Sequence, residues 1–310
     1  MAWRCLDSLS TNVASVGDAL EIEENMRFVS FETQGKASYG VWKDEGTWLQ
    51  APSDFTAQYP DLKAVIAATQ LDQLAVAATE AGQVVQSNDA QLLAVIPNPG
   101  KVFCVGLNYK SHVAEMKRAD SEHPAIFIRF ADSLSAHGAP LPKPVATSRF
   151  DFEGELAVII GKGGRNISQA DAWDHIAGYA CFNDGTARDW QRHTHQWAPG
   201  KNFPKTGPLG PYMATRSDIP DVNQLNLETR LNGQVMQQAS VANLIFTLPV
   251  IIEYISGFTQ LSPGDVIATG TPGGVGDKRD PAVYMKAGDV IEVEITGLGT
   301  LRNVVTDSEV

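Results

Sequence analysis

Short runs in which apolar and polar residues alternate predict β-strands at the start of the chain. Three such runs lie between residues 27 and 49, and their period of two is that of strands with one buried face. Residues 62–94 instead carry Leu, Val, Ile and Ala at helical spacing. These patterns predict a small α/β domain over residues 26–97, which ends at the turn-forming stretch 97–100.

The longer remainder, residues 98–310, is predicted to be rich in strands. Apolar runs bounded by Gly, Pro or Asn predict strands at 101–106, 125–130, 155–160, 225–231, 265–269 and 290–295. Helical spacing predicts helices at 109–118, 168–174 and 243–256. Because strands outnumber helices and do not alternate regularly with them, we predict an α+β, β-rich fold with mixed strand directions.

Composition and charge exclude several classes of protein. The 310 residues are 43% hydrophobic and 19% charged, as in an ordinary globular protein. A net charge of −12 and a pI near 4.9 argue against nucleic acid or an anionic membrane surface as partner. No apolar run reaches the roughly 18 residues of a membrane span. Cys5, Cys104 and Cys181 are too few for a disulfide framework or a zinc cluster, so we expect a cytoplasmic protein.

The first 25 residues do not have the pattern of a targeting segment. They lack the apolar core of a signal peptide, and their acidic residues argue against a transit peptide. Residues 26–31 then begin the first predicted strand. We therefore expect residues 1–25 to be a mobile extension, or Met26 to be the natural start.

Two carboxylates stand two positions apart at the start of the predicted strand 155–160. Side chains alternate along a strand, so Glu153 and Glu155 point the same way, roughly 6.6 Å apart along the backbone. Two like charges beside apolar surface are costly unless a cation lies between them, and Mg²⁺ or Ca²⁺ prefers such oxygen ligands. Asp184, at the end of the next apolar run, is a candidate third ligand. The alternative is that both glutamates lie on a solvated strand face and that Asp184 caps the following helix.

A second constellation lies on the predicted helix 109–118, for which Asn108 is a plausible N-cap. His112 and Glu115 are i, i+3 neighbours, and a carboxylate beside an imidazole raises its basicity, as suits a general base. The alternative is an exposed pair without a catalytic role. Residues 268–276 fit neither the dinucleotide nor the P-loop pattern, but their backbone N–H groups and the Thr271 hydroxyl can offer a carboxylate an anion nest.

The order of several short motifs resembles that of the fumarylacetoacetate hydrolase family. The resemblance covers residues 100–305, about two thirds of the chain. The motifs are Gly106-Leu-Asn-Tyr with His112-x-x-Glu115, Phe152-Glu-x-Glu-Leu156, Asn183-Asp184 with Ala187-Arg188-Asp189-x-Gln191, Gly200-Lys201-x-Phe203, Leu261-x-Pro-Gly-Asp265 and Thr269-Gly-Thr-Pro272. Each motif is weak alone, but six in this order are hard to obtain by chance.

The resemblance implies a mixed β-roll catalytic domain, which is expected to be a homodimer. It implies that Glu153, Glu155 and Asp184 hold Mg²⁺, Mn²⁺ or Ca²⁺, and that His112 and Glu115 orient an attacking water. The remaining positions match substrate-facing residues: Lys201 and Gln191 for oxo or carboxylate groups, Thr271 for a carboxylate, His195 in place of a Tyr, and Arg129 in place of a common Lys.

The implied activity is hydrolysis of a carbon–carbon bond in a 2,4-dioxo acid of the acylpyruvate type, giving pyruvate and a carboxylic acid. The alternatives on the same site are an oxaloacetate-type decarboxylase and a hydroxydienedioate isomerase. A non-catalytic family member is disfavoured, because the ligands, the dyad and Lys201 are all present. Leu107 and Arg129 depart from the family pattern at the substrate end, which leaves the identity of the small-molecule oxo acid open.

Overall fold

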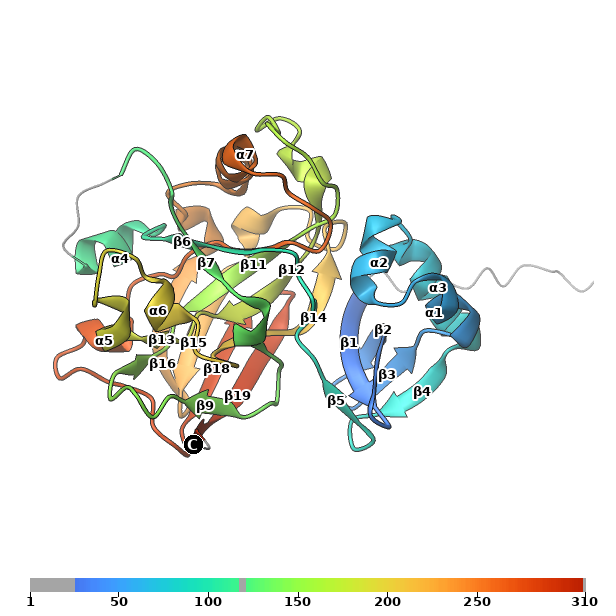
Figure 1. The fold of residues 1–310 in the computed structure, drawn as a ribbon, viewed down its shortest axis with the longest axis horizontal. Helices are drawn as coiled ribbons and strands as arrows, with labels where there is room; N and C mark the ends of the chain where they lie inside the picture. Colours follow the sequence, from blue (N-terminus) through green and yellow to red (C-terminus); the bar gives the residue numbers. More distant parts are fainter. Residues whose placement is uncertain (1–25, 117–120, 309–310) are drawn as a thin grey trace, which may run out of the picture.

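The computed structural model describes residues 26–116 and 121–308, and Figure 1 shows their arrangement. Strands dominate, parallel and antiparallel pairs occur together, and the helices are short, so the predicted β-rich α+β fold is confirmed. The prediction for residues 1–25 concerns a segment outside the described residues. Within the described part of the chain, no helix is both long and apolar enough to cross a bilayer.

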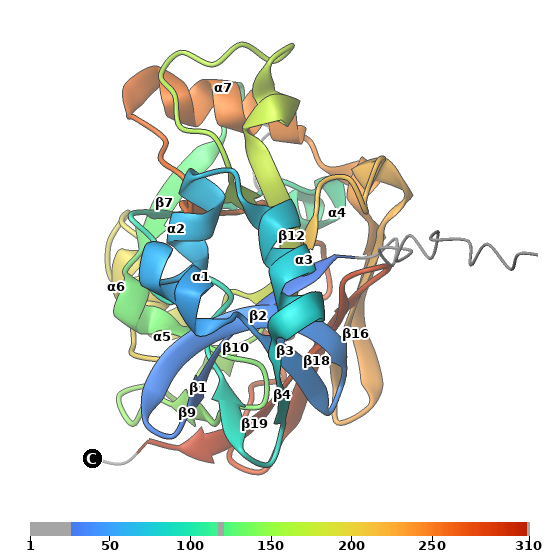
Figure 2. The ribbon, with the colours of Figure 1, turned by 90° about the vertical axis from the view of Figure 1, so that its right-hand side faces the viewer.

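The N-terminal part is a small antiparallel sheet covered by helices on one face (Figure 2). Its elements are β1 (Arg27–Thr33), β2 (Lys36–Asp44), β3 (Thr47–Gln50), α1 (Ser53–Gln58), α2 (Leu62–Ala67), α3 (Leu71–Ala81), β4 (Gln83–Gln86) and β5 (Ala90–Leu92). Leu74, Ala75 and Ala78 form the buried stripe of α3, as the spacing predicts. The helical prediction is wrong beyond residue 81, because extended Gly82 ends α3 and the chain turns back as β4.

The strands of the N-terminal part belong to a larger sheet that also runs through the rest of the chain. From β1 its order is β1-β14-β12-β11-β17-β6-β7. The added strands are β6 (Val102–Gly106), β7 (Ala125–Arg129), β11 (Gly154–Ile160), β12 (Ile176–Asn183), β14 (Gly207–Thr215) and β17 (Val266–Ala268), with β8 (Leu134–Ser135) beside β14. β1 pairs with β14 through Arg27–Ala214 and Phe28–Met213, and one buried apolar cluster also contains residues of both parts.

A second, five-stranded sheet lies beside the central strands of the large one (Figure 1). It consists of β16 (Gln234–Ser240), β15 (Asn226–Leu231), β18 (Val290–Ile295), β19 (Gly299–Asp307) and β9 (Leu141–Lys143), in that order. A two-stranded ribbon, β10 (Phe150–Asp151) and β13 (Thr186–Ala187), lies at the ends of β11 and β12.

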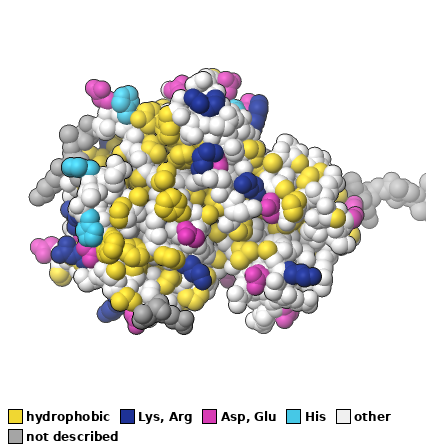
Figure 3. All heavy atoms as spheres, in the orientation of Figure 1, with side chains coloured by type: hydrophobic (Ala, Val, Ile, Leu, Met, Phe, Trp, Pro, Cys, Tyr) yellow, Lys and Arg dark blue, Asp and Glu magenta, His cyan; other side chains and the backbone are white. Residues whose placement is uncertain are grey.

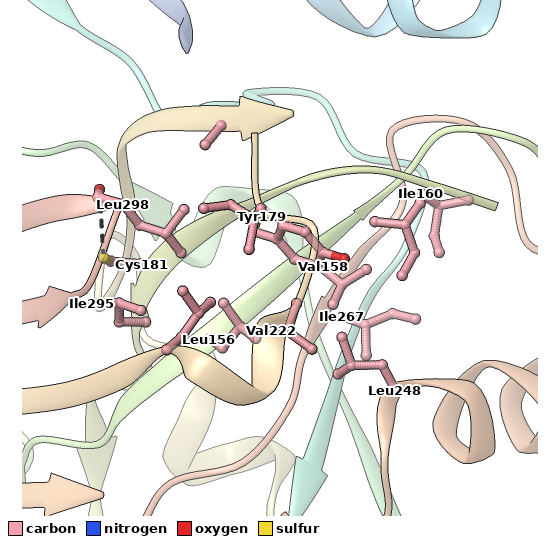
Figure 4. Close-up of a cluster of buried hydrophobic side chains, with 14 of the residues drawn as sticks. Leu156, Val158, Ile160, Tyr179, Cys181, Val222, Leu248, Ile267, Ile295 and Leu298 are labelled. Atoms are coloured by element: carbon pink, nitrogen blue, oxygen red, sulfur yellow. Dashed lines mark hydrogen bonds between the residues drawn. The ribbon is translucent and has the colours of Figure 1, made fainter. Parts of the chain in front are cut away.

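β11 is buried along its whole length and has a different core on each face. Leu156, Val158 and Ile160 belong to a cluster with Tyr179 and Leu248 (Figure 4). Ala157 and Ile159 on the other face pack in a second cluster. Burial of each large aliphatic side chain contributes about 1.5–3 kcal/mol, so the strand that carries Glu155 is anchored from both sides.

Two of the three helices predicted for the longer part, 109–118 and 243–256, have counterparts in α4 (Lys110–Glu115) and α7 (Leu248–Phe258), and both are shorter than the pattern suggests. Two further short helices, α5 (Arg188–Gln191) and α6 (Ala198–Lys201), were not predicted. α7 begins at residue 248 and not at 243, because Thr247 is an extended N-cap and Pro249 suits the first turn. Over 168–174 the structure has only the 3₁₀ turn Ala172–His175. The last residues of the predicted helix 109–118 lie outside the described part.

Candidate active site

Three carboxylates meet where β11 begins and β12 ends. Glu153, Glu155 and Asp184 are buried, and each offers an oxygen within 4.8 Å of the others. Strand register brings them together: Gly154 pairs with Asn183, and the Asp184 N–H donates to the Glu153 carbonyl at 2.8 Å. The alternative of a solvated strand face is wrong, and so is a capping role for Asp184, because Ala187 is the N-cap of α5.

Two buried cations touch these carboxylates from the cavity side. Lys201 Nζ donates to Glu153 Oε2 at 2.7 Å and to Asp184 Oδ2. Arg188 Nη1 lies 2.6 Å from Glu153 Oε1, and Arg188 Nε donates to Asp151 at 2.8 Å. Arg188 is buried, and its charge compensates Asp151 and Glu153, because an unpaired buried carboxylate would be far more costly.

Arg129 lies behind Asp184 and not in the cavity where substrate was expected to meet it. Its guanidinium donates to Asp184 Oδ1, to the Gly185 carbonyl at 3.2 Å and to Thr206 Oγ1 at 2.8 Å. The planar guanidinium suits this set of acceptors better than an ammonium does. The structure therefore places Arg129 as a support for a candidate metal ligand, and it is absent from the described residues that line the cavity.

The surrounding charges shift the pKa values of Glu153 and Glu155 in opposite directions. Burial alone would raise the pKa of Glu153, but Arg188 and Lys201 overcome this and hold that pKa well below its usual range. Burial raises the pKa of Glu155, and the neighbouring charges of Asp184 and Glu153 raise it further. Among the described residues no cation forms a salt bridge with Glu155, whose Oε2 accepts only the Gly270 N–H at 2.8 Å. The site is thus short of positive charge, and three hard oxygen donors suit a divalent cation.

His112 and Glu115 form the dyad that the spacing on α4 predicts. His112 Nδ1 lies 3.2 Å from Glu115 Oε2, and Glu115 Oε1 accepts the Gly274 N–H at 3.0 Å. His112 is buried and lines the cavity, so its free Nε2 is the ring nitrogen left for a substrate. The predicted N-cap role of Asn108 is wrong: Tyr109 is the N-cap, and the Asn108 amide donates to the Thr269 carbonyl at 2.7 Å.

The loop 269–276 does bind carboxylates, but they belong to the protein. Its N–H groups donate to Glu155 from Gly270, to Glu115 from Gly274, and to Asp151 from Gly276 at 2.9 Å. The Thr271 hydroxyl donates to the Gly154 carbonyl at 2.9 Å. One loop therefore fixes the positions of three carboxylates: Glu155, Glu115 of the dyad, and Asp151, which pairs with Arg188.

These groups surround a cavity of about 460 Å³, a size suited to a small molecule. Seven predicted residues line it: His112, Glu153, Glu155, Gln191, His195, Lys201 and Thr271. Asp184 and Glu115 contact those residues from outside the lining, and Arg129 contacts Asp184. The apolar wall consists of Val105, Leu107, Met116, Phe127 and Trp197, and the mouth adds Arg192, His193 and Thr194. Charged side chains of both signs are scattered over the face shown in Figure 3.

Sequence reasoning missed three buried polar residues around this cavity. Arg188 and Asp151 form one ion pair, and Gln237 reaches the site from β16. The signal that could have indicated Arg188 is its place in the family motif Ala187-Arg188-Asp189-x-Gln191. Nothing in the local sequence marks Gln237, because its partners lie 83 and 34 positions away.

Comparison with known proteins gives a consistent result. The family model described as fumarylacetoacetate (FAA) hydrolase C-terminal matches residues 101–306. A mitochondrial oxaloacetate tautomerase of Xenopus laevis is 40% identical over 236 residues, covering 75% of this chain and 74% of that protein. An oxaloacetate tautomerase of Bacillus subtilis is 42% identical over 220 residues, covering 70% and 73%.

Solved structures of similar proteins extend the comparison to the N-terminal part. A fumarylacetoacetate hydrolase from Exiguobacterium antarcticum superposes with a TM-score of 0.79 at 34% identity, covering 91% of this chain and 100% of that one. A 2-hydroxyhepta-2,4-diene-1,7-dioate isomerase from Mycobacterium marinum superposes with a TM-score of 0.71 at 29% identity, covering 92% and 100%. The match therefore extends well beyond residues 101–306.

The raised pKa of Glu155 predicts that metal binding displaces a proton. The affinity for Mg²⁺ should rise with pH, by about tenfold per pH unit where Glu155 titrates above the ordinary carboxyl range. Calorimetric titration of the metal-free protein over a pH series, in buffers of different ionisation enthalpy, measures both the affinity for Mg²⁺ and the number of protons released. Glu155→Gln should bind weakly and without this pH dependence. A wild-type affinity that is flat with pH would show that Glu155 is already ionised before the metal binds.

Removing Arg129 should destabilise the fold through Asp184. In Arg129→Met the buried Asp184 keeps only Lys201 as a cationic partner, and the free energy of unfolding should fall by about 3–5 kcal/mol. Chemical denaturation measures this loss. Arg302→Met, which removes an exposed cation 3.6 Å from Glu292, is the control and should change stability by less than about 1 kcal/mol. Equal stability of the two variants would remove Arg129 from its supporting role.

Proposed function

The chain belongs to the fumarylacetoacetate hydrolase family, and we propose that it interconverts the keto and enol forms of oxaloacetate or a closely similar 2-oxo dicarboxylic acid. The observation that carries the proposal is that His112, held by Glu115, lines the same cavity as Glu153 and Glu155 of the buried carboxylate triad. One proton-transfer group and one cation site therefore face the same small molecule. The relatives named oxaloacetate tautomerase, at 40% and 42% identity, support this reaction over the hydrolysis expected from the sequence.

The proposed cofactor is Mg²⁺, with Mn²⁺ or Ca²⁺ as alternatives, held by Glu153, Glu155 and Asp184. The fit rests on the donor set: three buried carboxylates close together, one of them without a cationic partner among the described residues. A divalent cation bound there would supply positive charge next to the 2-oxo group of the substrate, which favours its enol form.

Tautomerisation needs only a proton moved between carbon and oxygen, with no water and no leaving group. In the keto-to-enol direction the C3–H bond breaks, the C2–C3 double bond forms, and a proton ends on the 2-oxo oxygen. His112 Nε2 takes the proton from C3 and delivers it to the 2-oxo oxygen as the C2=O double bond becomes a single bond, while Glu115 holds Nδ1 and so fixes the tautomer. The order reverses for ketonisation, so the reaction consumes no other reactant.

Lys201 supplies a fixed positive charge at the deep end of the cavity. Burial would lower its pKa, but the carboxylates of Asp184 and Glu153 raise it above the ordinary value, so the ammonium stays charged. Substrate oxygens near the triad meet this ammonium and the Arg188 guanidinium, which also lines the cavity. Gln191 accepts from Arg188 Nη1 at 3.1 Å, which leaves its amide N–H₂ free to donate to the substrate.

Hydrolysis of a 2,4-dioxo acid of the acylpyruvate type is the second candidate. The structural similarity to a fumarylacetoacetate hydrolase favours it, and the same His112 could activate a water. The similarity to a dienedioate isomerase instead supports a reaction of proton transfers alone, like the tautomerisation. Decarboxylation of oxaloacetate also needs no attacking water and is tested with the same substrate.

A substrate panel separates these reactions. With Mg²⁺ the enzyme should speed the loss of the ultraviolet absorbance of enol-oxaloacetate without releasing pyruvate, and EDTA should abolish the effect. Acetylpyruvate and fumarylpyruvate test hydrolysis, with pyruvate measured by a coupled enzyme. Pyruvate from oxaloacetate would indicate decarboxylation, and pyruvate from a dioxo acid alone would overturn the tautomerase proposal in favour of the hydrolase.

Loss of the imidazole should remove most of the activity and leave the metal site intact. His112→Ala is expected to lower kcat by about 10²–10⁴-fold, the range for losing a positioned acid–base group, with an unchanged affinity for Mg²⁺. Stopped-flow measurement of enol decay and metal titration give the two quantities. His123→Ala, which alters an exposed histidine stacked on Tyr254, is the control and should keep full activity. Full activity of His112→Ala would remove the dyad from the mechanism.

A further inference from the structure

One buried amide from the second sheet contacts the backbone between two of the carboxylates. Gln237 lies on β16 and is 1% exposed. Its partners are Gly154, which separates Glu153 from Glu155, and the loop that carries Thr271. We propose that Gln237 is a positioning residue that holds Glu153 and Glu155 at the spacing a divalent cation requires. The inference rests on the metal site of the proposed function.

The contacts form a closed ring of three hydrogen bonds. The Gly154 N–H donates to Gln237 Oε1 at 2.9 Å, and Gln237 Nε2 donates to Thr271 Oγ1 at 2.7 Å. The Thr271 hydroxyl then donates to the Gly154 carbonyl at 2.9 Å. The ring thus holds both peptide groups that flank Gly154, one leading to Glu153 and the other to Glu155.

These side chains occupy a gap in the strand ladder. β17 pairs with β11 only from Ala157 onward, and the Thr269 N–H donates to the Leu156 carbonyl as the last backbone bond on this side. Among the described residues, β17 does not extend far enough to pair with Gly154. The side chains of Gln237 and Thr271 therefore bind the Gly154 N–H and C=O groups instead. Without them, the segment that carries the two ligands would have buried, unpaired N–H and C=O groups.

The chemistry of the amide fixes its orientation. Gln237 Nε2 donates its second hydrogen to the Pro272 carbonyl at 2.9 Å. A flipped amide would direct N–H₂ at the Gly154 N–H and its oxygen at the Pro272 carbonyl, losing both of these bonds. Gly154 itself must lack a side chain, because a Cβ there would lie 2.1 Å from Thr229 Oγ1 on β15. The second sheet therefore approaches the ligand strand closely enough for Gln237 to reach it.

The test measures metal binding without substrate. In Gln237→Met, which keeps the length of the side chain and removes its hydrogen bonds, the dissociation constant for Mn²⁺ should rise by about 10–100-fold. The signal of free Mn²⁺ in electron paramagnetic resonance gives this constant directly. Gln238→Met changes the exposed neighbour on the same strand and should bind Mn²⁺ as the wild type does.

A double-mutant cycle with Thr271→Val distinguishes positioning from a general loss of stability. Because the ring is one unit, the losses of Mn²⁺ affinity in Gln237→Met and Thr271→Val should not add in the double variant. Gln237→Glu keeps an acceptor for the Gly154 N–H but places a carboxylate oxygen against the Pro272 carbonyl, so it should also bind Mn²⁺ more weakly. If Gln237→Met does not fold, Gln237→Glu provides the test in its place.

The outcomes separate this inference from the proposed function. Wild-type affinity in folded Gln237→Met, or additive losses in the cycle, would overturn the positioning role while leaving the metal site standing. A wild-type protein that binds no Mn²⁺ would overturn the metal site and the inference with it. Tautomerase activity does not enter either measurement, so a different substrate for this enzyme would leave the result for Gln237 unchanged.

Discussion

Compensation of buried charge is the constraint on which this site depends. Asp151, Glu153, Glu155 and Asp184 are buried together, and among the residues that the structure describes only Arg129, Arg188 and Lys201 form salt bridges with them as buried cations. Each uncompensated charge in such an environment costs several kcal/mol, so the cations cannot be lost independently of the carboxylates. Glu155 remains the carboxylate without a cationic partner among these residues. This imbalance is the physical reason why a metal ion is the expected occupant.

The backbone around the carboxylates is held from three directions. The register of β11 and β12 places Glu153 next to Asp184, and the loop 269–276 donates N–H groups to Glu155 and Glu115. The five-stranded sheet supplies Gln237 from the third side. Segments far apart in the chain thus meet at one strand end. A change in any of these elements is expected to move the oxygen atoms that a cation would bind.

The same geometry explains why the family resemblance alone does not choose a reaction. A cation site, a charged Lys201 and the His112 dyad suffice both to move a proton on carbon and to activate water. The relatives named oxaloacetate tautomerase favour the first reaction, which needs no leaving group. Leu107, Trp197 and His195 also line the cavity.

The sequence by itself determined the elements and the residues whose chemistry is local. Alternation and helical spacing predicted most strands, and the two-residue spacing of Glu153 and Glu155 indicated a shared face before any fold was known. The i, i+3 spacing likewise gave the His112–Glu115 contact, since a helix fixes that distance. The helical prediction is wrong for residues 83–92, because pairing with distant strands overrides a helical composition there.

Only the tertiary structure decided which distant groups compensate and position the carboxylates. Arg129 lies 55 positions from Asp184, and Gln237 lies 83 positions from Gly154, so no local pattern connects either pair. An arginine is ordinarily exposed, yet Arg188 is buried because Asp151 and Glu153 need its charge. Local spacing fixes the chemistry of neighbours in sequence, whereas burial and charge pairing depend on strand register and on how the sheets pack.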